Sequence, residues 1–143
     1  MSTQENKALI RRVVEEVWNA GHLDLVDELY HPDYVRHNAA GGVPLGPAGE
    51  RRHRAAFRAA FPDLHITAED IIAEGDRVAV RYRWHATHQG EFLGIPATGR
   101  RVTLSGIAIH RVVGGKIKEL WVVGDELGLM RQLGAIPSDT DGA

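Results

Sequence analysis

The sequence predicts an α+β domain in which helices come first along the chain and a curved antiparallel sheet follows. In the first third of the 143-residue chain, apolar residues recur at the three- and four-residue spacing of a buried helix face. Over most of the remainder, apolar and polar residues alternate, which is typical of strands with one buried face. Helices gathered before strands indicate the α+β class. A strongly curved sheet closed at one end by helices would leave a pocket, the usual form of a small-molecule site.

Three helices are expected in the first part of the chain. Ser2 and Glu5 have the spacing of a capping box, which predicts the start of the first helix. Leucine and valine within residues 23–29 indicate a second, short helix. A third begins near Pro47, a residue type favoured in the first turn, and ends before Pro62. The first third of the chain is therefore predicted to be helical.

The rest of the chain is predicted to form strands and one last helix. The expected strands cover residues 64–72, 78–88, 101–113 and 116–123, and the helix covers residues 127–133. The Gly-Gly pair at 114–115 indicates a two-residue hairpin, since type I′ turns need positive φ at both positions.

The same turn predicts the register of the last two strands. If the residues flanking it pair with each other, His110 lies opposite Glu119 and Ala108 lies opposite Trp121, with all four on one sheet face. A histidine and a glutamate paired across strands can be a catalytic dyad or a structural pair, and the structural role is the more common one.

The composition excludes several classes of protein. Lys and Arg number 17 against 19 Asp and Glu, a net charge of −2, which lacks the basic excess of a nucleic-acid binder. Cysteine is absent, which excludes disulfides and thiolate catalysis. No apolar run approaches the roughly 18 residues of a membrane span, and the polar N-terminus does not resemble a secretory signal. We expect a cytoplasmic protein without nucleic-acid or membrane partners, with one domain at residues 1–137 and a flexible tail at 138–143.

The sequence contains no recognised metal or nucleotide motif. Its 8 histidines are dispersed and no HExxH motif occurs, so no metal site is expected. The glycines between residues 90 and 99 match neither glycine-rich phosphate fingerprint and indicate a shaped loop. Arg51, Arg54 and Arg58 recur at helical spacing, which we interpret as a solvated face, with an anion contact as the alternative.

Several short motifs resemble the SnoaL-like polyketide cyclase group, or ester cyclases, of the nuclear-transport-factor-2-like superfamily. They are FPDL at 61–64, IAEGDRV at 72–78, THQGEFLGIP at 87–96, TGR at 98–100, GKI at 115–117, Glu119, Trp121, Asp125 and QLG at 132–134. The resemblance extends over residues 5–136, nearly the whole chain.

This resemblance implies a cone-shaped, cystatin-like fold in which a curved antiparallel sheet and N-terminal helices enclose a deep apolar pocket. It also implies a homodimer packed through the outer face of the sheet. Characterised members catalyse an intramolecular aldol cyclisation without metal or cofactor, so no cofactor is expected and the expected ligand is a small apolar organic substrate. The same fold also carries isomerases, epoxide hydrolases and binding modules.

Three residues are predicted to be catalytic, because aldol cyclisation needs a base and a donor that stabilises the developing enolate. Asp125 matches the family acid at the pocket rim, although an aspartate before the last helix is also a good N-cap. His88 falls on the strand face of Tyr82 and Trp84, so its imidazole either enters the pocket or bonds to loop backbone. His37 lies in a segment that lines the cavity in the family, and a solvated loop histidine fits equally well.

The residues predicted to contact substrate are mostly aromatic, because flat apolar walls suit a polycyclic ligand. They are Trp18, Tyr34, Phe57, Trp84, His110, Glu119 and Trp121. Related cyclases are expected to carry an aspartate and a histidine on the last two strands, facing the substrate. The corresponding positions here are Val122 and Ala108, neither of which can act as an acid or a base.

Three functions are therefore considered. The first is a cofactor-independent cyclase or isomerase that acts by acid–base catalysis on an apolar, polyketide-like carbonyl substrate. The second is epoxide opening in the same cavity, with Asp125 and Glu119 as acids. The third is a non-catalytic, dimeric binding module, which the missing pair on the last two strands favours.

Overall fold

The structure, a computed structural model, describes residues 2–37 and 45–137. Its helices are α1 (Thr3–Arg12), the π-helix η1 (Val13–Asn19), α2 (Leu25–Leu29), α3 (Pro47–Ala60) and α4 (Glu126–Gln132). Its strands are β1 (Tyr30–Arg36), β2 (His65–Glu74), β3 (Arg77–Thr87), β4 (Arg101–Val113) and β5 (Lys116–Gly124). The tail at 138–143 lies outside the described residues, so its predicted flexibility and the domain boundary at 137 stay predictions.

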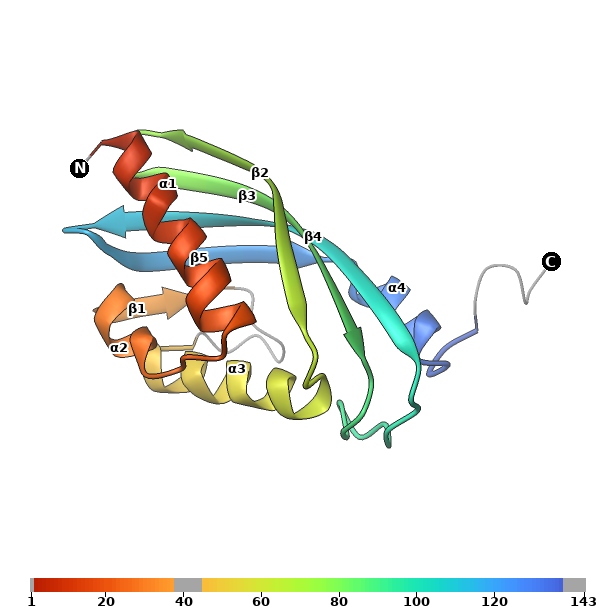
Figure 1. Cartoon of the computed structure of the whole chain (residues 1–143). Coiled ribbons are helices and arrows are strands. Elements are labelled where there is room, and N and C mark those ends of the chain that lie inside the picture. Colours follow the sequence, from red (N-terminus) through yellow and green to blue (C-terminus); the bar gives the residue numbers. More distant parts are fainter. Residues whose placement is uncertain (1, 38–44, 138–143) are drawn as a thin grey trace.

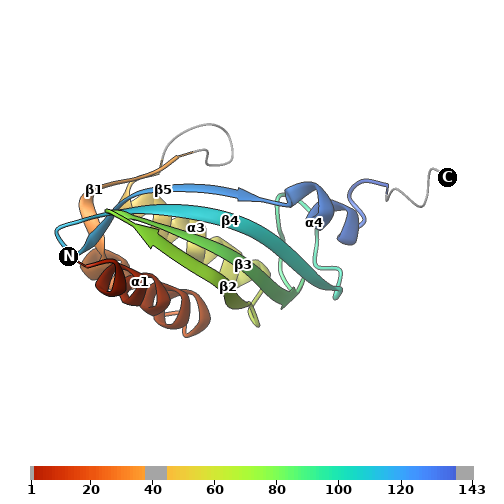
Figure 2. The ribbon, with the colours of Figure 1, turned by 90° about the horizontal axis from the view of Figure 1, so that it is seen from above.

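The strands form one curved sheet in the order β1-β5-β4-β3-β2. Strands β2 to β5 are an antiparallel meander, and β1 joins β5 in parallel. The sheet bends around α1 and α3, which lie on its concave side (Figure 1). Seen from above, both helices lie on the same side of the sheet, and α4 lies beyond the end of β5 (Figure 2). The predicted α+β class and curved sheet are confirmed.

One part of the fold prediction is wrong, because β1 occupies a segment that was expected to be helical. Its residues include Pro32, which cannot donate a ladder hydrogen bond and is tolerated on an edge strand. The sheet is therefore mixed. Strand β1 also contributes a residue to the site, because it brings Arg36 to the concave side of the molecule.

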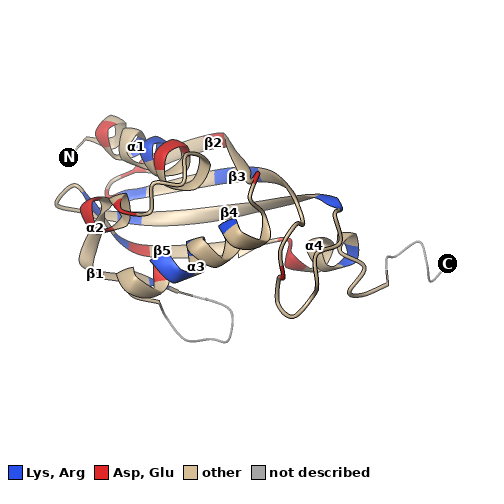
Figure 3. Ribbon diagram, turned by 60° about the horizontal axis from the view of Figure 1, so that its bottom comes forward, with Lys and Arg blue, Asp and Glu red and all other residues tan. Residues whose placement is uncertain are grey.

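Local signals in the sequence explain most of the other boundaries. The Ser2 hydroxyl accepts a hydrogen bond from Glu5 N–H at 3.1 Å, and the Glu5 carboxylate accepts one from Ser2 N–H, so the predicted capping box is confirmed. Gly114 and Gly115 both have positive φ, as the predicted hairpin turn requires. Acidic and basic residues occur together along α1 (Figure 3). Among the described residues, no helix combines the length and apolarity needed to cross a bilayer.

The core consists of two apolar clusters on the concave face of the sheet. One gathers α1, η1, α2 and β1 against the middle of the sheet, and the other gathers the end of α3 and α4 against its far end. Trp18 and Tyr82 pack against both clusters. The functional site lies at this junction.

Candidate active site

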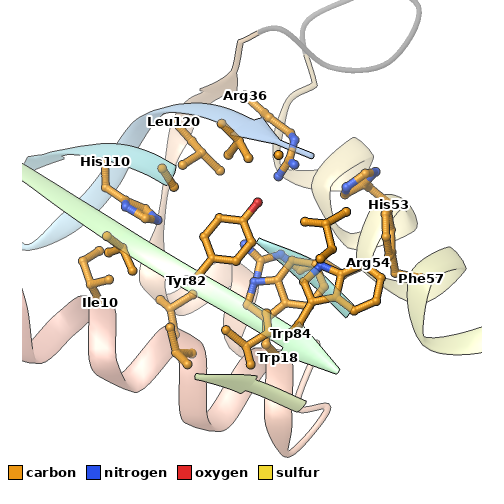
Figure 4. Close-up of a pocket in the computed structure, with 18 of the residues that line it drawn as sticks. Ile10, Trp18, Arg36, His53, Arg54, Phe57, Tyr82, Trp84, His110 and Leu120 are labelled. Atoms are coloured by element: carbon orange, nitrogen blue, oxygen red, sulfur yellow. The ribbon is translucent and has the colours of Figure 1, made fainter. Parts of the chain in front are cut away.

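A pocket opens between the concave face of the sheet and helices α1, η1 and α3 (Figure 4). Its space, including the part open to solvent at the mouth, is about 850 Å³. Trp18, Phe57 and Trp84 form aromatic walls. Phe57 meets the edges of both tryptophan rings, with ring centroids 6.3 and 6.2 Å apart. These three predicted substrate contacts therefore line one cavity.

A buried cluster of charges stands behind one wall of the pocket. The Glu50 carboxylate is fully buried and accepts hydrogen bonds from Arg36 Nη1 at 3.1 Å and from Arg54 Nε at 2.9 Å. Burial alone would raise the pKa of Glu50, but the two adjacent guanidinium groups hold it below its ordinary value. The carboxylate is therefore ionised and fixes both arginines.

The position of Arg54 follows from the spacing of residues on α3. Glu50, Arg54 and Phe57 recur at intervals of four and three, so they share the helix face that packs against the sheet. The Arg54 guanidinium lies over the rings of Trp18 and Tyr30, at 4.5 and 5.2 Å from their centroids, and donates to the Tyr30 hydroxyl. The interpretation of this arginine stripe as a solvated face is wrong for Arg54, which is buried.

Two histidines that line the pocket are held neutral by their surroundings. Burial, followed by the positive charge of Arg36, lowers the pKa of His53 to about 4. Burial, followed by the charge of Arg54, lowers the pKa of His110 to about 4. A neutral imidazole can accept a proton, so each ring is a candidate base at neutral pH. His53 packs against the wall residue Phe57, with ring centroids 4.9 Å apart.

Tyr82 brings a hydroxyl to the centre of the pocket (Figure 4). The strand positions beneath it are Gly106 and Gly124, and a Cβ atom at Gly106 would collide with the phenol oxygen. Glycine at position 106 therefore gives the ring its place against the sheet. Burial raises the pKa of Tyr82, so its hydroxyl stays protonated and can donate.

Asp125 lies at the end of β5, but it does not line the pocket. Its side chain is exposed and accepts a hydrogen bond from Gly128 N–H at 2.9 Å, which makes it the N-cap of α4. The carboxylate that does line the pocket belongs to the next residue, Glu126.

His88 also lies outside the pocket lining. It is fully buried directly after β3, where its Nδ1 accepts a hydrogen bond from Thr98 N–H at 3.2 Å and contacts the Thr98 hydroxyl at 2.9 Å. Phe61 packs on the ring, with centroids 5.5 Å apart. The structure thus gives His88 the alternative role, in which a histidine holds the backbone of the glycine-rich loop.

The predicted register of the last hairpin is wrong beyond its first pairs. A bulge at Lys118 shifts the pairing, so Arg111 lies opposite Glu119 and His110 lies opposite Leu120. Because successive side chains alternate between faces, the one-residue shift places His110 in the pocket and Glu119 on the outer face. No His110–Glu119 dyad exists.

The outer face instead gathers His37 with Glu119 and Trp121. His37 Nε2 lies 3.2 Å from the Glu119 carboxylate, and its ring stacks on Trp121 with centroids 4.9 Å apart. Arg111 also pairs with Glu119, and Arg77 lies over the Trp121 ring at 5.2 Å. None of these five residues lines the pocket, so the predicted roles of His37, Glu119 and Trp121 at the substrate are not supported by their positions.

Tyr34 is buried behind the pocket wall and does not line the cavity. Its ring packs edge-on against Tyr30, and burial raises the pKa of its hydroxyl. By contrast, Ala108 and Val122 pair directly across β4 and β5 and both line the pocket. The positions where the family pattern expects an aspartate and a histidine thus face the cavity and are apolar here.

Four polar residues in or behind the pocket wall were not predicted from the sequence, and Arg54 was predicted only as a solvated residue with an anion contact as the alternative. The four are Arg36, Glu50, His53 and Glu126. A usable signal lies in the spacing of Glu50, Arg54 and Phe57, which places a charge pair on the apolar face of the third helix. Within the described residues, no group of three or more histidine, aspartate or glutamate side chains is arranged to hold a metal ion.

Comparison with known proteins identifies relatives over nearly the whole chain. Aklanonic acid methyl ester cyclase DnrD of Streptomyces peucetius is 34% identical over 142 residues, covering 94% of this chain and 92% of its own. Nogalonic acid methyl ester cyclase of Streptomyces nogalater is 32% identical over 127 residues, covering 87% and 95%.

Solved structures show the same fold. AclR of Streptomyces galilaeus, described as a hydroxylase, superposes with a TM-score of 0.86 at 36% identity, covering 96% of this chain and 85% of that one. IdmH of Streptomyces antibioticus, described as a polyketide cyclase, has a TM-score of 0.79 at 34% identity, covering 90% and 98%. The predicted cone-shaped fold is thereby confirmed. A family model described as SnoaL-like polyketide cyclase matches residues 8–133, and the chain therefore belongs to this family of cyclase enzymes.

Proposed function

We propose that the chain catalyses an intramolecular, aldol-type cyclisation of an apolar, polyketide-like carbonyl substrate by acid–base chemistry, without a cofactor. The observation that carries the proposal is a neutral imidazole, His53, held beside the fixed cation Arg36 in a mostly apolar pocket. Such a pair supplies the two requirements of the reaction, a proton acceptor and a positive charge for the enolate oxygen.

In the proposed reaction, His53 removes a proton from the carbon next to a substrate carbonyl. Arg36 stabilises the negative charge that develops on that carbonyl oxygen. The enolate carbon then forms a bond to the carbon of a second carbonyl, whose oxygen takes a proton from the imidazolium of His53, or from the Tyr82 hydroxyl, which then recovers its proton from that imidazolium. All atoms of the substrate are retained in the product.

The substrate class comes from the relatives and from the pocket. The curated relatives are named for aklanonic and nogalonic acid methyl esters. Three aromatic walls suit the flat faces of a fused-ring ligand of that kind. We therefore propose a methyl ester of an aromatic polyketide as the substrate class.

The proposal places the base on α3 rather than on the last two strands. Ala108 and Val122 supply no acid or base at the paired positions on β4 and β5. His53 comes from α3, across the pocket from the sheet, whereas Arg36 comes from β1, the sheet neighbour of β5. The substrate would therefore present its acidic carbon to the helical wall.

Hydroxylation is a second candidate, because AclR is described as a hydroxylase and is similar to this chain over 96% of its length. The mass of the product separates the two reactions, since cyclisation leaves it unchanged and hydroxylation adds one oxygen atom. Epoxide opening is not favoured, because Asp125 and Glu119, its expected acids, do not line the pocket.

The test is turnover of aklanonic and nogalonic acid methyl esters by purified wild-type, His53→Gln and His22→Gln proteins. Loss of a general base costs about 100-fold or more in kcat, so His53→Gln should show that loss with an unchanged melting temperature. His22 is exposed in the loop after η1, and its variant should retain wild-type kcat. Undiminished turnover by His53→Gln would refute the assignment.

We also infer that the protein forms a homodimer through the outer face of the sheet. Ile107, Ile109 and Val123 are exposed there, at 54%, 37% and 70%. Ile107 pairs with Val123 and Ile109 with Trp121 across β4 and β5, so these side chains form one apolar patch. A cytoplasmic location, the absence of a cofactor and the absence of nucleic-acid and membrane partners stay predictions.

A further inference from the structure

Two nitrogen atoms at the inner end of the pocket are buried and have no protein partner. They are Nη1 of Arg54 and Nδ1 of His110. Both residues line the pocket and are more than nine-tenths buried, with exposed fractions of 3% and 7%. Figure 4 shows the His110 ring directed into the cavity and the Arg54 side chain among the rings of Tyr82, Trp18 and Trp84. Buried polar groups are nearly always hydrogen-bonded, so these two atoms indicate a place for ligand atoms.

The charges around this end of the pocket do not cancel. Arg36 and Arg54 are both ionised, and among the described residues each forms an ion pair with Glu50 alone. Tyr30 stays neutral, because burial raises the pKa of its hydroxyl to about 12. One positive charge is therefore left over beside an apolar cavity, where an unpaired charge is costly. A negatively charged ligand group would remove that cost.

The two atoms differ in what they can bind. Arg54 Nη1 can only donate, because a guanidinium has no acceptor. His110 Nδ1 can accept or donate a hydrogen bond, according to which ring nitrogen carries the proton, and a hydroxyl group suits either state because it can donate and accept.

We propose that the inner end of the pocket is a subsite for an acidic oxygen on a ring system, bound as an oxyanion by Arg54, beside a hydroxyl group that forms a hydrogen bond with His110 Nδ1. This inference rests on the proposed function, because it specifies the substrate class of the same pocket. The oxyanion can belong to a carboxylate or to an ionised enol, and both present the same chemistry to a guanidinium. A polyketide whose carboxyl is esterified still offers acidic enols and hydroxyls.

The geometry of Arg54 suits this role. Its guanidinium is held by Glu50, by the Tyr30 hydroxyl and by the faces of Trp18 and Tyr30, so it is ordered before a ligand arrives. A preorganised donor loses little freedom on binding, and a hydrogen bond between two charged groups is among the strongest in proteins.

The test is calorimetric binding of matched ring compounds to the full chain at pH 7. One pair is 3-hydroxy-2-naphthoate and its methyl ester, and the other is 2-hydroxy-1,4-naphthoquinone, an acidic enol, and its methyl ether. In at least one pair the anion should bind roughly tenfold more tightly than its neutral partner. The pair that shows the preference identifies the oxyanion as carboxylate or enolate. Equal affinity within both pairs would overturn the proposal, and this comparison needs no variant.

Variants then assign the preference to the two residues. Arg54→Met should abolish the preference for the anion, whereas Arg52→Met, which removes an exposed charge from the same helix, should retain it. 3-Hydroxy-2-naphthoate should bind more tightly than 2-naphthoate to the wild type and equally tightly to His110→Phe. If Arg54→Met still binds the anion more tightly than the neutral ligand, the oxyanion part of the subsite is wrong. If the wild type binds 3-hydroxy-2-naphthoate and 2-naphthoate equally tightly, the hydroxyl part is wrong.

Binding and turnover fail independently. If the wild type prefers anions but cyclises neither methyl ester, the subsite stands and the proposed function falls. If His53→Gln loses turnover but no ligand pair differs in affinity, the proposed function stands and the subsite falls.

Discussion

At the scale of single residues, the site depends on how burial and charge act together on His53. Burial away from water by itself favours the neutral form of the histidine, and the charges of Arg36 and Arg54 strengthen that preference. Glu50 acts in the opposite direction. Arg36 thus lowers the basicity of His53 and, in the proposed reaction, stabilises the enolate oxygen, so its charge opposes the proton transfer to His53 and favours the anion that this transfer creates.

The pH dependence of kcat/KM follows from this arrangement. His53 must be neutral to accept a proton, and its pKa is lowered to about 4, so activity should stay level from pH 8 to pH 5 and fall as the pH drops through 4. In Arg36→Met one cause of the lowered pKa is removed, and the acid limb should move to higher pH. A wild-type limb near the ordinary histidine value of 6.5 would contradict the assignment.

Some of the site could be predicted at this scale and some could not. Trp18, Phe57 and Trp84 were expected in the pocket because flat aromatic side chains suit a polycyclic ligand, and they line it. His53 was overlooked and Arg54 was interpreted as solvated, because charged or polar residues on a helix are usually exposed. Their burial depends on Glu50 and Arg36, which lie on the same helix and on a strand that the sequence did not indicate.

At the scale of elements, two local features decide where side chains point. The bulge at Lys118 reverses the faces of Glu119 and Trp121 relative to a regular hairpin, and the turn sequence does not encode it. Strand β1 pairs in parallel with β5 at the sheet edge, and its Pro32 resembles a helix terminator more than a strand residue. Both depend on contacts distant in sequence, whereas the helix caps and the Gly-Gly turn are local and were predicted.

Asp125 offers a prediction at this scale, because its side chain caps α4. Asparagine caps helices as well as aspartate, so Asp125→Asn should keep its stability, and Asp125→Ala should lose about 1 kcal/mol of the free energy of unfolding in urea. Both variants should retain wild-type kcat on the cyclase substrates. Loss of turnover in both, with stability lost only in the alanine variant, would restore Asp125 as the catalytic acid.

At the scale of the whole molecule, the two faces of the sheet have separate tasks. The concave face carries the pocket, and the outer face carries an apolar patch of Ile107, Ile109 and Val123 beside the ring of Trp121. An exposed patch of this kind in a sheet centre is typical of an interface. The His37–Glu119–Arg111 group lies beside it and would form a polar rim.

Substitution in the patch tests the dimer. Ile107→Glu should convert the dimer to a monomer in analytical ultracentrifugation, because it places a charge in the apolar centre of the interface. Leu93→Glu is the matched control, since Leu93 is 67% exposed but lies in the loop between β3 and β4. A wild type that sediments as a monomer, or an Ile107→Glu protein that remains a dimer, would show that this face is not the interface.

The neutral state of His53 beside a fixed cation is tested most directly by an NMR titration of the protein with isotopically labelled histidine, in which the His53 signals are assigned by their loss in His53→Gln. We expect constant His53 shifts between pH 8 and pH 5 and a titration at about 4. A His53 ring that titrates near 6.5, the value of a histidine in water, would contradict it.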